Sequence, residues 1–207
     1  MEKLLTELID RKEVHLLARE APIRVECIGS MSDSAPAIYL SRLTIGKLVD
    51  LHAAFRLALT LDEVSMRTAT VEPPQIRVAF ELTSRHSDDV DQISRELDLQ
   101  ATYAVRKGDW QPRVRRRSER TRWQFSLALH DAEDFDHDVG LMLKLLESRL
   151  DRVSSLTAHQ FDGSLLLFAH FVSRVPTITL TYEQLRLVRR LGLDVGADLI
   201  RVAPRDV

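Results

Sequence analysis

The chain of 207 residues is poor in the residues that mark disulfide scaffolds, membrane spans and phosphate-binding loops. Its single cysteine, Cys27, excludes an intrachain disulfide, which suits a reducing compartment. Seven glycines leave few places where bare backbone could cradle a phosphate, and no glycine-rich phosphate-binding motif occurs. No apolar run approaches the roughly 20 residues that a membrane-spanning helix needs.

An excess of charge of one sign is lacking as well. The formal net charge is -2, so no global field draws the chain towards nucleic acid or a membrane surface. Charged residues interrupt the apolar residues of the opening stretch MEKLLTELIDRKE, so we expect neither a signal peptide nor a transit peptide. Together with the lone cysteine, these features predict a cytoplasmic protein. A hydrophobic content of 44% is enough for an ordinary core.

One pattern occurs twice. It reads APAIYLSRLTIGKLVDLHAAFRLALTL over residues 35–61 and VPTITLTYEQLRLVRRLGLDVGADLI over residues 175–200, so that Pro36 aligns with Pro176, 140 residues later. Ser41 and Thr181 occupy matching positions and are good helix N-caps, because a hydroxyl can accept a backbone N–H. Each copy therefore reads as short strand, capped helix and strand. The match extends back to LIDR at 8–11 and RLDR at 149–152, with the strand from Pro22 set against the strand from Ser164. We interpret the pattern as an old internal duplication.

The second copy has a front half that the first copy lacks. QIRVAFELTS, from Gln75, alternates apolar and polar residues as a strand does. A helix follows, with Ser87 as its expected N-cap, and then a strand RTRWQFSLAL with Trp123 on its apolar face. The order β-α-β-α-β-β-α-β predicts an α+β fold, with helices on one face of a mainly antiparallel, ferredoxin-like sheet.

The expected organisation is one complete domain plus a half repeat. We place the partial repeat (helix-strand-strand-helix-strand) at 1–61, a linker at 62–74 that ends in Pro73-Pro74, and the complete domain at 75–207. A half copy would expose the apolar face that its missing front half should cover. It could pack in cis on the complete domain, which we favour, or pair with a second chain in a homodimer. The chain could also be an amino-terminal truncation of a longer protein.

A family resemblance rests on several patterned segments. They are the strand before Ser84, ISRELDLQAT from Ile93, KGDW from Lys107, Trp123 and Ser126 in RTRWQFSLAL, LMLKLLESRL, and LTYEQLRLVRRLGLDVGADLI. Through these, residues 75–202 resemble the bacterial domain-of-unknown-function family 4279 as a complete domain. Residues 1–61 resemble the back half of a second such domain. The resemblance implies a fold and a bacterial origin, and no catalytic residue. A dense arginine run stands where the family leads us to expect a mixed loop.

That run, RKGDWQPRVRRRSERTRW over residues 106–123, is the strongest candidate for a binding site. It carries eight basic residues against Asp109 and Glu119. Guanidinium groups suit phosphate or carboxylate, and an exposed tryptophan could stack on a base. The candidate residues are Trp110, Arg113, Arg115, Arg116, Arg117, Arg120 and Arg122. The simpler interpretation is a solvated loop in which nearby acids pair with some of the arginines.

The next stretch, HDAEDFDHD over residues 130–138, holds five acids and two histidines. Its spacing matches neither a calcium loop nor a zinc motif. Acids at a helix start stabilise the positive end of the helix dipole, so we prefer a helix start and leave open whether Asp131–Asp138 binds a metal. The acids could also neutralise the arginine run.

The sequence contains no nucleophile elbow, HExxH motif or Cys-His signature. We therefore expect no enzyme, and we assign no cofactor and no catalytic, cofactor-binding or metal residue. The expected function is a protein-binding module of the immunity or adaptor type, with an unidentified protein partner. The alternative is binding of nucleic acid or another polyanion through Arg106–Arg122. A small-molecule site between the sheet and the half copy is a third class, which a deep polar pocket would favour.

Overall fold

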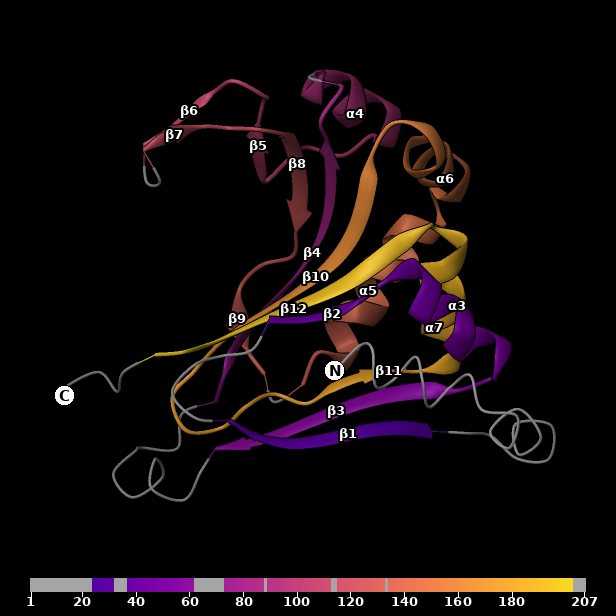
Figure 1. Ribbon diagram of the computed structural model, residues 1–207, viewed down its shortest axis with the longest axis vertical. Coiled ribbons are helices and arrows are strands. Elements are labelled where there is room, and N and C mark those ends of the chain that lie inside the picture. The colour runs from indigo at the N-terminus through magenta and orange to yellow at the C-terminus, as the bar shows by residue number, and fades with distance from the viewer. Residues whose placement is uncertain are drawn as a thin grey trace.

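The computed structural model describes residues 24–31, 37–61, 73–87, 89–112, 115–132 and 134–202. These residues form two main sheets with helices between them (Figure 1). The predicted α+β class is confirmed, because the chain combines five described helices with sheets whose strand pairs are mostly antiparallel. The helix expected before residue 24 and the linker over 62–72 lie outside the described residues.

Each sheet contains strands from both ends of the chain. The small sheet has the order β1 (Arg24–Met31), β3 (Ala54–Leu61), β11 (Ile178–Leu180). The large sheet has the order β2 (Ala37–Leu40), β12 (Leu193–Arg201), β10 (Asp162–Phe171), β4 (Gln75–Ser84), β8 (Thr121–Ser126), β5 (Tyr103–Val105), and β9 (His130–Asp131) also pairs with β4.

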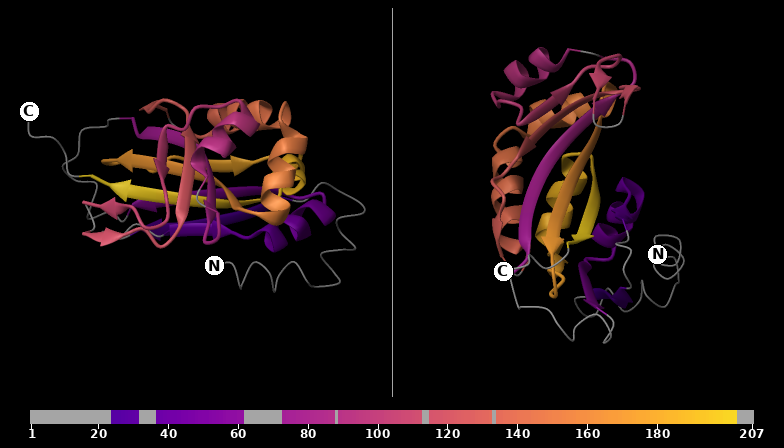
Figure 2. Two further views of the ribbon diagram at one scale, coloured as in Figure 1. Left: turned by 90° about the horizontal axis from the view of Figure 1, so that it is seen from above. Right: turned by 90° about the vertical axis from the view of Figure 1, so that its left-hand side faces the viewer.

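Three helices fill the space between the sheets: α3 (Arg42–Asp50), α5 (Asp136–Glu147) and α7 (Tyr182–Arg190). Helix α5 contacts β4 of the large sheet and β11 of the small sheet, and α7 contacts β12 and β3 in the same way. Two further helices, α4 (Val90–Leu97) and α6 (Leu150–His159), pack together at the far end of the large sheet. The large sheet therefore carries its helices on one face, and the right-hand view of Figure 2 shows β4, β10 and β12 from the open side.

The two β-β-α-β units exchange their short strands. Strand β2 pairs with β12 of the second unit, and β11 pairs with β3 of the first. Ile38 lies opposite Ala197 and Ile178 opposite Leu57, so both pairs keep the offset of 140 (178 − 38 = 197 − 57 = 140). Residues 37–61 thus pack on the rest of the chain through hydrogen-bonded strands that cross the expected domain boundary. That the two units arose by duplication stays a prediction.

The long parallel ladders obey the same offset. Arg24 of β1 pairs with Ala54, and Ser164 of β10 pairs with Asp194, again 140 residues later. The sequence alignment, which allowed shifts of one or two residues, set Pro22 against Ser164 and so differs from the paired registers by two residues. Strand periodicity cannot detect such a difference, because a shift of two residues leaves every side chain on the same face.

Both units begin and end their helix alike. The hydroxyls of Ser41 and Thr181 accept the N–H groups of Thr44 and Gln184 at 3.3 and 3.2 Å, which confirms the two predicted N-caps. After each helix, one residue takes a left-handed backbone, with φ of 51° at His52 and 66° at Gly192. Such a residue commonly ends a helix and turns the chain, here into the following strand.

The expected N-cap at Ser87 was wrong. Asp89 caps α4 instead, because its Oδ1 accepts the N–H of Gln92 at 2.8 Å. Ser87 belongs to the turn after β4, where its N–H donates to Ser84 Oγ at 3.0 Å. Ser87, Asp88 and Asp89 are all residue types that cap helices well. The turn that follows β4 decides which of them stands at the start of the helix.

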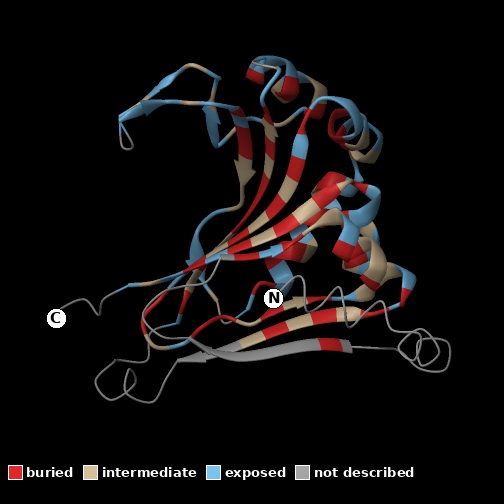
Figure 3. Cartoon of the chain, in the orientation of Figure 1, coloured by how far each residue is buried: buried red, intermediate tan, exposed pale blue. Residues whose placement is uncertain are grey.

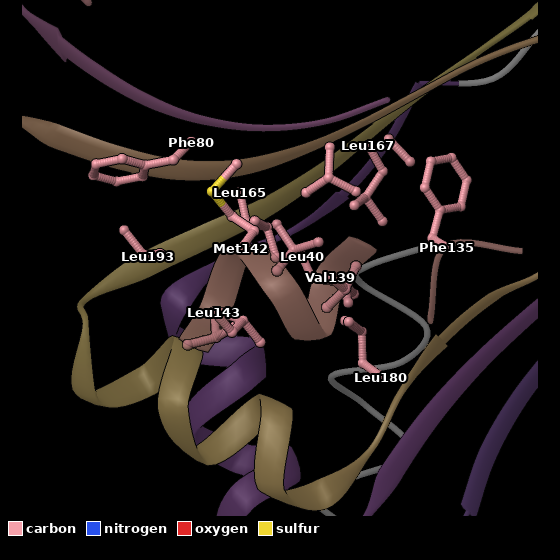
Figure 4. Packing of buried hydrophobic residues seen from close by; sticks show 14 of the residues in the cluster. Leu40, Phe80, Phe135, Val139, Met142, Leu143, Leu165, Leu167, Leu180 and Leu193 are labelled. Atoms are coloured by element: carbon pink, nitrogen blue, oxygen red, sulfur yellow. The ribbon is translucent and has the colours of Figure 1, made fainter. Parts of the chain in front are cut away.

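One continuous core unites the two units. The same cluster of buried apolar side chains includes Leu48 and Phe55 from the first unit and Phe80 and Val188 from the rest of the chain. Figure 4 shows Leu40 of β2 and Leu180 of β11 on either side of Val139 in α5. Both exchanged strands therefore contribute a buried leucine to the core around α5.

Because of this exchange, we expect Leu40→Ala and Leu180→Ala to destabilise the same structure. Both side chains are buried, so each change should lower the free energy of unfolding by ~2–5 kcal/mol. Urea unfolding followed by circular dichroism should show one transition that both changes move. The control Leu43→Ala, at a side chain 69% exposed on α3, should stay within ~0.5 kcal/mol. Two separate transitions, with only the weaker moved by Leu40→Ala, would contradict a shared core.

Candidate partner-binding surface

The arginine run forms a narrow two-stranded ribbon between β5 and β8, which we call the arginine ribbon (residues 106–120). Its strands are β6 (Trp110–Gln111) and β7 (Arg116–Arg117), and Trp110 lies opposite Arg117. The ribbon projects away from the helices (Figure 1) and is exposed along most of its length (Figure 3). Because the ribbon buries so little surface, its side chains are accessible to a binding partner.

Hydrogen bonds hold the base of the ribbon. Gly108, with φ of 90°, donates its N–H to the Ser118 carbonyl at 2.8 Å. Asp109 Oδ2 accepts the Arg106 N–H at 2.8 Å, and Thr121 Oγ1 accepts the Lys107 N–H at 3.1 Å. These bonds hold the base of the ribbon against the start of β8.

At the tip, an aromatic side chain stands beside exposed cations. Trp110 is 58% exposed, as the sequence predicted. Arg115 and Arg116 are exposed too, and neither makes an ion pair with any residue that the structure describes. The guanidinium of Arg117 donates to the Gly108 carbonyl at 2.8 Å. Arg113, a further predicted residue, lies outside the described residues.

The other arginines of the run lie at the base and have acidic partners. Arg106 contacts Asp91 at 2.7 Å, and Arg120 lies 3.9 Å from Asp162. Arg122 of β8 contacts Glu81 of β4 at 3.1 Å. Among the described residues, the predicted arginines therefore divide into Arg115 and Arg116, which have no ion pair, and Arg120 and Arg122, which have acidic partners. The partners described for these arginines come from β4, β10 and the start of α4, and none belongs to the acidic stretch at 131–138.

Glu81 is the partly buried member of the pair with Arg122. Its side chain is 12% exposed, against 53% for Arg122. Burial raises the pKa of Glu81 above its usual value of 4.5, and the nearby charge of Arg122 opposes that rise. The carboxylate thus holds an arginine in place at the root of the ribbon while retaining a tendency to take up a proton.

Glu81 lies on the open face of the large sheet. The strand registers set one row of residues across five strands of this face: Tyr103, Gln124, Glu81, Ser164 and Asp194. In the next rows, the guanidinium of Arg77 lies 4.9 Å from the centroid of the Phe168 ring. Tyr103 at one end is 43% exposed. The row leads from the middle of the sheet to the strand that carries the ribbon, so ribbon and open face are continuous.

Sequence reasoning missed this open face. Strand β4 was identified by its apolar positions, among them Ile76 and Val78, and the alternate positions were not considered as a surface. The same alternation places Arg77 and Glu81 together on the opposite side. The alternation along β4 therefore predicts a second face for this strand. Only the pairing of β4 with β8 and β10 shows which side chains lie beside Arg77 and Glu81 on that face.

The acidic stretch begins a helix, in agreement with the preferred interpretation. Asp136 and Asp138 lie in the first turn of α5. Asp138 is buried, and its Oδ2 has no hydrogen-bond partner among the described residues, with His130 Nδ1 3.6 Å away. No group of three or more histidine, cysteine, aspartate or glutamate side chains in the described part of the chain is placed to share a metal ion.

The described surface also carries open hollows between helices. The first, of about 580 Å³, lies between α4 and the junction of α5 with α6 and is lined by Asp98 and residues 147–152. Its arginines are already engaged, because Arg149 Nε donates to the Leu97 carbonyl at 2.7 Å and Arg152 to the Glu96 carbonyl at 3.0 Å. These bonds satisfy the last carbonyls of α4, which is a structural role. This hollow lies away from the space between the sheet and the half copy.

Comparison with known proteins gives one match. The family described as Domain of unknown function (DUF4279) matches residues 74–200. No curated protein and no solved structure matches the chain. None of the described helices is both long enough and apolar enough to cross a membrane.

The pair at the root of the ribbon gives a prediction about pH. Because the pKa of Glu81 is raised on folding, the folded state binds the proton more tightly than the unfolded state does. The protonated side chain therefore favours folding at low pH, and this contribution is lost as the pH rises through the folded-state pKa. Glu81→Gln should therefore reduce the fall in the free energy of unfolding above pH 4.5, measured by urea unfolding at several pH values. Arg122→Gln should raise the pKa of Glu81 further in an NMR titration of its carboxyl group. The exposed Glu119→Gln is the control, and a Glu81 pKa below 4.5 would contradict the argument.

Proposed function

Since the chain belongs to the DUF4279 family, whose function is unknown, we propose its function from the surface alone: a non-enzymatic, protein-binding module of the immunity or adaptor type. The arginine ribbon engages an acidic surface of the partner protein. The observation that carries this proposal is the exposed Trp110, which lies opposite Arg117 on the same short ribbon as Arg115 and Arg116, two exposed cations without a described ion pair.

Tryptophan and arginine are the residues that most often dominate the binding energy of protein interfaces. Trp110 offers a large, rigid apolar surface that loses little conformational freedom on binding. The arginines beside it offer planar donors that match carboxylates in two-point contacts. An interface with an apolar anchor and a charged rim fits this arrangement.

The same tip could contact phosphate, but the base of the ribbon supports a protein partner better. Arg106, Arg120 and Arg122 each have an acid within 4 Å, whereas Arg115 and Arg116 at the tip have no ion pair with a described residue. Binding to a nucleic-acid duplex usually draws on several cations spread along the backbone. The open face next to the ribbon offers Tyr103 and the half-buried Phe168, which suit a partner with apolar side chains.

We expect the double variant Trp110→Ala, Arg116→Glu to lose its partner. Tagged wild-type and variant proteins would capture partners from a lysate of the source organism, with and without nuclease, and mass spectrometry would identify them. The affinity of a purified partner should then fall at least ~30-fold, the equivalent of a hot spot of ~2 kcal/mol.

The matched control is Leu141→Ala, Lys144→Glu, which removes an exposed apolar side chain and an exposed cation from α5, a helix that lies between the two sheets. It should bind as the wild type does. A capture that nuclease abolishes, with an affinity for DNA or RNA that falls steeply with salt, would instead favour nucleic acid. A partner that binds the double variant and the wild type equally would overturn the proposed site.

A further inference from the structure

The edges of the two sheets differ in length. Three of the four edge strands are short: β2 has four residues, and β5 and β11 have three each. The fourth, β1, has eight residues, and neither proline nor lysine occurs among them. Proteins commonly protect a sheet edge by making it short or by placing proline or lysine on it. Strand β1 lacks all three protections, and β3 is its one partner among the described strands.

The second unit shows which kind of strand can pair with the open edge of β1. Strand β10 corresponds to β1 at the offset of 140, and its edge away from β12 pairs with β4. That ladder is antiparallel and runs over nine residue pairs, from Asp162 to His170. The structure therefore assigns to the edge of β1 an antiparallel strand along Arg24–Ser30, the described positions that the offset sets against 164–170.

We infer that this strand is β1 of a second copy of the chain. Two identical strands can pair antiparallel about a two-fold axis, so one surface serves both subunits and the contact closes upon itself. The small sheet would become a continuous sheet of six strands in the order β11-β3-β1-β1-β3-β11. This homodimer is independent of the arginine ribbon, which projects from the other sheet.

The sequence of β1 allows such pairing. In an antiparallel pair, directly opposite residues must point to the same face of the sheet. For two copies of β1 this requires the two-fold axis to pass through a residue position, where that residue faces its own copy. The registers that pair the most residues of β1 place the axis at Cys27 or at Ile28. In the register centred on Cys27, Arg24 and Glu26 lie opposite Ser30 and Ile28, and in the register centred on Ile28, Glu26 lies opposite Ser30. The net charge of -2 on each chain adds little long-range repulsion.

The lone cysteine provides a direct test on the unmodified protein. In the register centred on Cys27, the two Cys27 Cα atoms would lie ~4.5–5.5 Å apart, and in the register centred on Ile28 ~7–8 Å apart. A short bismaleimide added to the dilute native protein should therefore link two chains through Cys27, as seen on a denaturing gel. Cys27→Ser should abolish the link.

Sedimentation of the full chain over a range of concentrations should show a monomer–dimer equilibrium. Ile28→Lys should shift this equilibrium to monomer, because it places two lysines opposite or next to each other across the new pair. The control Leu43→Lys, on the exposed side of α3, should remain dimeric. Circular dichroism would establish that both variants fold, and the crosslink needs no substitution beyond the native cysteine.

Three results would overturn the inference. One is a wild-type protein that sediments as a monomer at every concentration. That result would overturn the inference whether or not another part of the same chain covers the edge of β1. Another is a dimer that Ile28→Lys leaves intact. The third is a dimer whose Cys27 residues fail to crosslink. Loss of partner capture on changing Trp110, by contrast, would leave this test unaffected, so the two proposals stand or fall separately.

Discussion

The structure depends on the reciprocal exchange of two short strands. Strand β2 extends the large sheet and β11 extends the small sheet, so each unit supplies a hydrogen-bonded edge to the other. Backbone groups that would otherwise be unpaired are thereby satisfied on both sides. The helices α3 and α7 pack against each other between the sheets, which buries the apolar stripe of each. The apolar side chains of β2, α3 and β3 thereby become part of one core with the rest of the chain.

Polar contacts between the units follow the same arrangement. The Arg42 N–H at the start of α3 donates to Asp194 at the start of β12 at 2.7 Å. Arg189 of α7 reaches Asp50 of α3 at 2.6 Å, and the ring of Tyr182 stacks on His52 at 5.0 Å between centroids. These contacts are largely exposed and contribute less than the core, but they fix the angle between the helices. The interior is thus closed, and the surfaces left for partners are the ribbon, the open face and the edge of β1.

Local features of the fold could be predicted from the sequence, because each depends on neighbouring residues. The N-caps at Ser41 and Thr181, the strand from Gln75 and the burial of Trp123 all follow from spacing and residue type. The exchange could not be predicted, since Ile38 suits a place beside Leu57 as well as one beside Ala197. Because the two units have the same apolar pattern, each short strand could pair with the long strand of either unit. Only the packing of the whole chain selects the pairing with the other unit. The two-residue difference at Pro22 has the same origin.

The candidate site was predictable in part for the same reason. An exposed Trp110 follows from its place between Asp109 and polar residues, while Trp123 alternates with Phe125 on an apolar face. Which arginines are paired could not be foreseen, because the acids that pair with Arg120 and Arg122 lie about 40 residues away along the chain. The pairing of β4 with β8 and β10 brings these groups together and leaves the tip of the ribbon with uncompensated charge.

The exchange itself can be observed directly by NMR. Nuclear Overhauser effects between protons of directly opposite residues report which strands are neighbours, since these residues lie about 4.5–5.5 Å apart at their Cα atoms. The account predicts contacts between Ile38 and Ala197 and between Ile178 and Leu57. Contacts between Ile38 and Leu57 and between Ile178 and Ala197 would mean that each short strand stays with its own unit, and would contradict the exchange on which the structure rests.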